Sequence, residues 1–250
     1  MLIQFMGQCP SYKVRPNLEI ALGVIEPDIR PNPNLVRSAM DLQFRFRDVI
    51  KTEEELRAVM GHPSALVTRK ELNKLDSHAR VFIGRSPFLL IGTTGADGRV
   101  DMSPKGDPPG FVHVLDDKTL AIPDRLGNRR ADTFSNLVVN DQIGLIFLIP
   151  GKQETLRISG RAIIVRDPSI REEMAIGGKL PEFAIVVGVD QMFFHCAKCM
   201  IRSNLWKPEC WPTLSGLPSL AETMVSAGKL RQSVQEMQAI VDNDALTRLY

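Results

Sequence analysis

The segment Thr155–Val165, TLRISGRAIIV, alternates between polar and apolar or small residues over most of its length. Leucine, isoleucine, glycine and alanine occupy its even-numbered positions, whereas Arg157, Ser159 and Arg161 stand between them. A period of two residues is typical of a β-strand that buries one face and exposes the other. This pattern constrains the fold more than any other feature of the chain, because such a strand needs hydrogen-bonded neighbours on both sides.

Other apolar runs of strand length lie on either side of this segment. A Gly-Ala-Asp-Gly sequence at 95–98 follows the run at 88–94, and it predicts a hairpin with a return strand at 99–102. We expect about six strands, since further runs occur at residues 119–122, 143–149 and 183–189.

Few helical patterns separate these strands. Helices are expected at 53–60, 73–85 and 129–140, after Asp167-Pro168, and twice after Ser219, the last through Val234, Met237 and Ile240. Short spacing with tight turns favours an antiparallel barrel or sandwich over a parallel sheet. The expected fold class is therefore mainly β (α+β), with helices flanking the sheet.

Composition and charge exclude several classes of function. The 250 residues include 31 basic and 29 acidic ones, and a net charge of +2 gives no case for nucleic-acid binding. No apolar run approaches the length of a membrane span, and the N-terminus does not resemble a secretory signal. With only four cysteines, we expect a cytoplasmic protein with reduced thiols.

The first 40 residues differ from the rest of the chain. Five prolines with little periodicity predict an irregular N-terminal arm at 1–40, before a domain at 41–250. Met40 is a possible second translation start, so whether residues 1–39 belong to the natural protein stays open.

The segment IPDRLGNRRAD (122–132) places Arg129 and Arg130 at the expected start of a helix. A helix start is already partly positive, so cations are unfavourable there unless an anion is bound. Guanidinium groups donate in pairs to phosphate oxygens, which suggests a phosphate site. The alternative is that both arginines are solvated, with Asp124 or Asp132 as partners.

Two other segments are candidates for a site. The loop SPKGDPPG (103–110) is rigid and would present Ser103 and Lys105 to a ligand, although a plain turn is the simpler interpretation. The sequence Cys196-Ala-Lys-Cys199 has the spacing of a metal or redox pair. It lacks a second pair for zinc, so we expect buried structural cysteines and no metal.

No sequence motif for nucleophilic or acid–base catalysis is present, nor is a nucleotide-binding glycine motif. If the protein is an enzyme, a cofactor is expected to supply the chemistry.

The order of five motifs resembles the pyridoxamine 5′-phosphate oxidase-like, FMN-binding split-barrel superfamily, and within it the FMN-dependent proteins with no settled substrate. The resemblance extends across about residues 41–250. It rests on SPKGDPPGFV (103–112), LAIPDRLGNRR (120–130), IGLIFLIPG (143–151), ETLRISGRA (154–162) and HCAKCMIRSNLW (195–206).

This resemblance implies a six-stranded antiparallel split β-barrel that forms a homodimer with FMN at the subunit interface. It assigns the FMN phosphate to Arg129 and Arg130 after the turn at Asn128, and the ribityl chain and ring to Ser103 and Lys105. The remaining implied cofactor-binding residues are Pro123 and Asp124 at a strand end, Thr155 and Arg157 on the next long strand, and Lys198 and Arg202, which match by spacing only.

The function implied is that of an FMN-dependent oxidoreductase acting on a small molecule. The region 195–206 departs from the motif that closes the site in the oxidase itself, and the arginine–histidine pair for the vitamin substrate is not evident. The alternative is a non-catalytic flavin- or haem-binding module. The substrate, the electron donor and the choice between FMN and a deazaflavin remain open.

Overall fold

The computed structural model describes residues 46–250, so the predicted arm at 1–40 lies outside the described residues. The chain divides into two compact units between Ser64 and Ala65, and each is described by itself. The first contains helix α2 (Glu53–Met60). Thr52 and Glu55 form a reciprocal capping box at its start, which confirms the helix expected at 53–60.

The second unit is built on one antiparallel sheet with seven strands, one more than the sequence predicted. Strand β3 is only two residues long, and the sheet is not closed into a complete barrel by backbone hydrogen bonds in the described chain. The order is β2-β1-β5-β6-β7-β4-β3. The strands are β1 (Phe88–Thr94), β2 (Val100–Gly106), β3 (His113–Val114), β4 (Thr119–Pro123), β5 (Gln142–Leu148), β6 (Thr155–Val165) and β7 (Ala184–His195).

Two strands are longer than predicted. Strand β2 continues through Pro104, which pairs with Leu90, so the predicted loop at 103–110 is wrong in its first half. A proline is tolerated there because β2 is an edge strand and needs no donor on its outer side. Strand β7 extends to His195, six residues beyond the predicted end, and pairs with β6 from Ala184 to His195 except at Asp190.

One face of the sheet forms the hydrophobic core. Side chains alternate between buried and partly exposed along β1, β5 and β6, as the period of two predicted. The buried side chains of five strands belong to a single cluster, which includes Leu89, Leu120, Leu145, Leu156 and Val187. The sheet therefore curves around one core.

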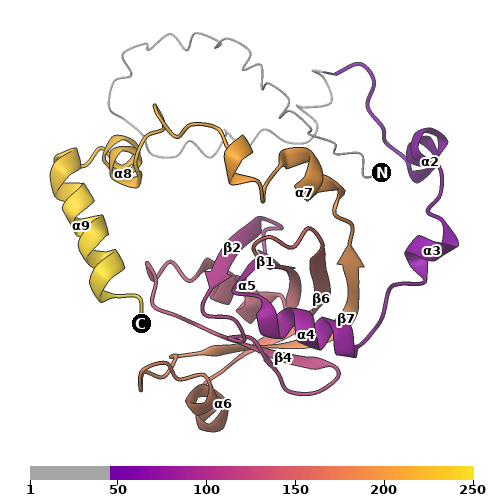
Figure 1. Ribbon diagram of the computed structural model, residues 1–250, viewed down its shortest axis with the longest axis horizontal. Helices are drawn as coiled ribbons and strands as arrows, with labels where there is room; N and C mark the ends of the chain where they lie inside the picture. The colour runs from indigo at the N-terminus through magenta and orange to yellow at the C-terminus, as the bar shows by residue number, and fades with distance from the viewer. Residues whose placement is uncertain (1–45) are drawn as a thin grey trace, which may run out of the picture. The chain divides into compact units, whose positions relative to one another are not determined.

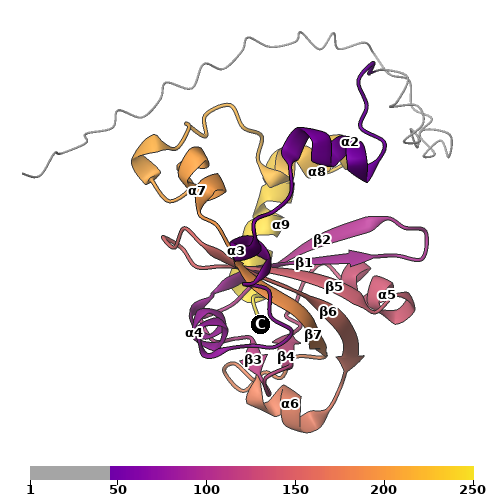
Figure 2. The same cartoon turned by 90° about the vertical axis from the view of Figure 1, so that its right-hand side faces the viewer.

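Two helices pack on this core. Helix α4 (Ser77–Arg85) contributes Ala79 and Ile83, and it starts later than predicted because Asp76 caps it by accepting from Ala79 N–H. Helix α5 (Asp132–Val139) contributes Leu137 and contacts β1, β2 and β6. In Figure 2, α5 lies at the right of the view and α4 at the left, near β3, so the two helices cover different ends of the core that the sheet encloses.

The two longest strands, β6 and β7, pair through a β-bulge. The register between β6 and β7 shifts between Ser159 and Gly160, so Asp190 is left without a partner in the ladder. A Cβ atom at Gly160 would overlap the carbonyl oxygen of Gly188. Glycine is required here because the two backbones approach more closely than a side chain allows.

The remaining helices follow the strands in short segments. Helix α7 begins directly after β7, as Figure 1 shows, and α8 and α9 each begin at a serine with a capping box. This confirms the two helices expected after Ser219. The bounds are α3 (Ala65–Thr68), α6 (Pro168–Glu173), α7 (Lys198–Ser203), η2 (Pro208–Cys210), α8 (Leu220–Gly228) and α9 (Val234–Thr247).

Candidate functional site

Two ion pairs join the ends of β2 and β4, which share no backbone pairing in the described sheet. Lys105 Nζ lies 3.7 Å from Asp124 Oδ1, and Arg125 Nε lies 2.6 Å from Asp107 Oδ2. We call these four residues the seam. The sheet is thus closed at this point by side chains, and the sequence-predicted residues Lys105 and Asp124 are brought together.

Lys105 is positioned by β2. Asp101, Ser103 and Lys105 share the face of β2 that is turned toward α5, where Thr133 Oγ1 donates to Asp101 Oδ2 at 3.2 Å. Lys105 Nζ lies 5.8 Å from the ring centre of Phe134 in α5. A half-buried ammonium group between a carboxylate and an aromatic ring is suited to contact an anionic or electron-rich ligand.

Asp124 directly follows Pro123, the last residue of β4. Pro123 is buried and pairs with Ala184 of β7. Partial burial raises the pKa of the Asp124 carboxyl above its ordinary value, and the nearby Lys105 opposes this shift. The side chains of Lys105 and Asp124 remain 21% and 23% exposed, so solvent and small ligands reach the pair.

The loop before α5 has an unusual backbone. Arg129 and Ala131 both have positive φ angles, 60° and 57°, which are rare for residues other than glycine. Helix α5 therefore begins at Asp132, and the prediction that Arg129 and Arg130 form its first turn is wrong. Successive N–H groups converge where left-handed residues alternate with others, which gives a concavity that suits an anion.

The two arginines have different surroundings. Arg130 Nε donates to Asp132 Oδ2 at 2.8 Å, and Arg130 N–H donates to Asn128 Oδ1 at 3.0 Å. Arg129 makes no side-chain ion pair within residues 46–250. Asp132, one of the partners named in the solvated alternative, thus contacts Arg130. This ion pair is exposed, and such pairs are weak enough for a phosphate to compete.

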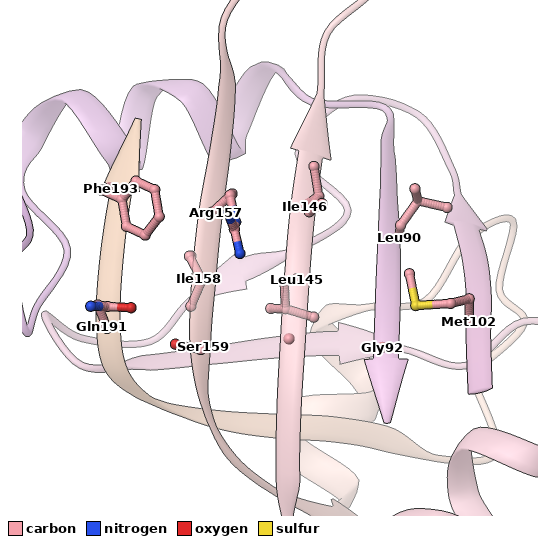
Figure 3. A pocket seen from close by; sticks show the side chains of 11 residues that line it. Leu90, Gly92, Met102, Leu145, Ile146, Arg157, Ile158, Ser159, Gln191 and Phe193 are labelled. Carbon is pink, nitrogen blue, oxygen red and sulfur yellow. The ribbon is translucent and has the colours of Figure 1, made fainter. Parts of the chain in front are cut away.

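Thr155 and Arg157 lie apart from the seam, on the outer face of the sheet. Thr155 is buried, and Arg157 lies 5.2 Å over the ring of its cross-strand partner Phe193. Figure 3 shows Phe193, Arg157, Ile146 and Leu90 in one row across four strands.

A shallow groove of about 180 Å³ runs beside this row. Gly92 and Gly144 are cross-strand partners at its centre, and their missing side chains hollow the surface between Met102 and Ser159. The outer face is therefore a half-exposed, largely apolar surface.

Lys198 and Arg202 are exposed on α7, and no ion pair or hydrogen bond of their side chains is found in the described part of the chain. The single chain therefore separates the predicted residues into three groups. The first group lies at the seam and in the loop that follows it, and consists of Ser103, Lys105, Pro123, Asp124 and residues 128–130. The second group, Thr155 and Arg157, lies on the outer face of the sheet. The third group, Lys198 and Arg202, lies on α7. Cys196 and Cys199 are exposed, so the expectation of buried cysteines is wrong.

Sequence reasoning missed Asp107 and Arg125. The carboxylate of Asp107 is 1% exposed, and it also accepts from the hydroxyl of Tyr250 at 2.7 Å. Arg125 additionally donates to the carbonyl of Met174 at 3.0 Å. Little in the sequence indicated this pair: Asp107 is the acidic residue of the proline-rich segment 103–110, and Arg125 is the arginine of 122–132 to which no role was assigned.

The fold and the site define a class: a curved antiparallel sheet in which a loop with two left-handed residues lies before α5, together with a seam of charged residues. Residues 75–196 match the family model of the pyridoxamine 5′-phosphate oxidase. The match begins two residues before α4, at the buried Leu75, and ends one residue after β7. The resemblance to the pyridoxamine 5′-phosphate oxidase-like, FMN-binding split-barrel family that the sequence motifs predicted is thus confirmed for residues 75–196.

The chain is also similar to solved structures. They include HupZ from Group A Streptococcus (18% identity, TM-score 0.40, 48% of this chain and 93% of that chain). Others are a protein related to general stress protein 26 from Clostridium acetobutylicum (18%, 0.37, 47% and 85%) and an FMN-binding protein from Syntrophomonas wolfei (11%, 0.37, 57% and 96%). No curated protein matches the chain. Among residues 46–250, no helix is both long and apolar enough to cross a membrane.

Proposed function

We propose that this protein binds FMN beside the seam and uses it as an FMN-dependent oxidoreductase on a small molecule. The observation that carries the proposal is the loop at 128–131. Two positive-φ residues, two guanidinium groups and the start of α5 converge there. Backbone N–H groups and two exposed cations next to a helix start together fit a terminal phosphate.

The residues fit the other parts of FMN in chemistry. Ser103 and Lys105 share a face of β2 that leads from the seam toward α5, and they offer a hydroxyl and an ammonium donor. Bound FMN would supply the electron- or hydride-transfer chemistry that no side-chain motif of this chain supplies. Lys105 would give up its contact with Asp124 and donate a hydrogen bond to the cofactor instead.

We propose that the protein is a homodimer that pairs through the outer face of the sheet. Leu90, Met102 and Ile146 leave apolar surface exposed or half-exposed around the groove, and such surface is stabilised by a partner. Dimerisation would also bring Thr155 and Arg157 to the cofactor, which a single chain does not. Met102→Glu should give monomers in light scattering, whereas Val138→Glu, at an exposed apolar position on α5, should not.

The phosphate assignment is tested by comparing FMN with riboflavin, which lacks the phosphate. The wild-type protein should bind FMN more tightly than riboflavin. Arg129→Ala combined with Arg130→Ala should weaken FMN binding by about 3 kcal/mol or more, since each charged donor contributes roughly 1.5–3 kcal/mol. Riboflavin affinity should change little, and Arg99→Ala, in the exposed β1–β2 turn, should leave both affinities unchanged.

Equal affinity of the wild-type protein for FMN and riboflavin would show that the phosphate assignment is wrong. Catalysis is tested separately, by stopped-flow reduction of the bound flavin with nicotinamide donors. A flavin that no donor reduces favours a non-catalytic module. A Soret band in the purified protein would instead indicate haem binding.

A further inference from the structure

The flavin site does not use the Cys196-Ala-Lys-Cys199 segment, although its position in the fold is distinctive. Strand β7 ends at His195 and α7 begins at Lys198, so the two cysteines bracket a strand-to-helix junction. Both side chains are exposed and free. A structural role in the core is therefore excluded for both thiols.

The backbone brings the Cα atoms of the two cysteines close together. Ala197 has right-handed helical angles (φ −70°, ψ −9°), and Lys198 is the first helical residue of α7. With two consecutive central residues in this conformation, four residues form a turn whose end Cα atoms lie less than about 7 Å apart. Disulfide bonds span Cα separations of about 4.4–6.8 Å, so a bond between Cys196 and Cys199 needs little backbone movement.

The junction is also firmly placed. Ile201 N–H donates to Ala197 O at 3.0 Å, which fixes the first turn of α7. On the other side, Thr155 pairs with His195 at the end of the β6–β7 ladder. Cys196 thus directly follows an anchored strand and Cys199 lies in the first turn of an anchored helix, so the backbone of both cysteines is held in place.

We propose that Cys196 and Cys199 form a redox-active dithiol that closes to an internal disulfide by exchange with low-molecular-weight disulfides. One thiolate attacks the small disulfide, forms a mixed disulfide and releases one small thiol. The second thiolate then attacks the protein sulfur of that mixed disulfide and releases the other small thiol. Two protein thiols are oxidised and one small disulfide is reduced to two thiols, so electrons and protons balance. The proposal does not depend on FMN binding.

The test uses the full chain, reduced and equilibrated with mixtures of reduced and oxidised glutathione. Free thiols are blocked with iodoacetamide, and peptides that contain residues 196–199 are quantified by mass spectrometry. The wild-type protein should shift from the blocked dithiol to the internal disulfide as the proportion of oxidised glutathione rises. Cys199→Ser should stop at the mixed disulfide on Cys196.

A matched control moves the second thiol without changing the composition. The double variant Cys199→Ser with Ser203→Cys moves the second thiol by about one helical turn, roughly 6 Å along the α7 axis from position 199 and away from Cys196. The new thiol is then beyond the reach of Cys196. This variant should form mixed disulfides but no internal bond. The proposal is overturned if the wild-type pair forms only mixed disulfides, links two chains on a non-reducing gel, or stays reduced in excess oxidised glutathione.

Discussion

Arg125 Nε lies 2.6 Å from Asp107 Oδ2, and this ion pair joins the ends of β2 and β4, two strands without backbone pairing between them. The hydroxyl of Tyr250 donates to the second oxygen of the same carboxylate at 2.7 Å, and the Arg125 guanidinium lies 5.7 Å over the Tyr250 ring. Arg125, the third arginine of its segment, is therefore a structural residue of the seam.

Removal of Arg125 should destabilise the fold strongly. Arg125→Ala leaves the carboxylate of Asp107, 1% exposed, without its cationic partner. An uncompensated buried charge costs about 3–5 kcal/mol, which urea unfolding will measure. The double variant with Asp107→Ala should recover part of this loss, because no charge is then left alone. A double variant no more stable than Arg125→Ala would contradict the assignment.

The left-handed conformation of Ala131 leads to a second prediction. Its φ of 57° is tolerated by glycine without strain, whereas a β-branched side chain is strongly disfavoured there. Ala131→Val should lower the free energy of unfolding by about 1–2 kcal/mol. It should also weaken binding of FMN more than that of riboflavin.

Ala131→Gly is the matched control, since it keeps the left-handed conformation. It should retain the FMN affinity and match or slightly exceed the wild-type stability. If valine and glycine at position 131 have the same effect on binding, the shape of this loop does not determine the phosphate site.

The close approach at Gly160 gives a third prediction. A Cβ atom there meets the backbone of Gly188, which has no flexible end that could move aside. Gly160→Ala should lower the free energy of unfolding by about 2 kcal/mol or more. Gly144→Ala, where a Cβ atom meets nothing within 4 Å, should be neutral or slightly stabilising. Thermal unfolding of both variants separates bulge strain from a general effect of removing a glycine.

The elements with strong periodicity were predictable from the sequence. The bounds of β1 and β6 agree with the predicted segments because alternating burial repeats over seven and eleven residues there. The later start of α5 was not predictable, since alanine favours helices and nothing local reports the positive φ of Ala131. The strand at Pro104 was likewise hidden, because only pairing with β1 reveals it.

The seam shows why half of the site escaped prediction. Lys105 and Asp124 each stood out locally, but their contact depends on how the whole sheet curves. Asp107 and Arg125 are 18 residues apart and follow the ends of two strands that are not neighbours, so no periodic pattern links them. The assignment of all eleven predicted residues to FMN stays a prediction.

The raised pKa of Asp124 gives the fourth prediction, a dependence of stability on pH. Because burial disfavours the ionised carboxyl, the folded protein binds the proton more tightly than the unfolded chain does. The resulting stabilisation is complete below the unfolded pKa of about 3.9 and is lost as the pH rises through the folded pKa. The variant Asp124→Asn cannot ionise at this position, so its free energy of unfolding does not include this decrease with pH. The wild-type free energy of unfolding should therefore fall relative to that of the variant as the pH rises.

Asp116 provides a control of opposite sign. The N–H of Lys118 donates to its carboxylate at 2.6 Å, and this hydrogen bond lowers the pKa of Asp116. The wild-type protein should gain stability relative to Asp116→Asn as the pH rises through the same range. Urea unfolding of the three proteins from about pH 3 to about pH 7 measures both differences. If the Asp124 difference rises with pH as the Asp116 difference does, the ion pair with Lys105 outweighs burial at the seam, and Asp124 is held there as a stabilising carboxylate.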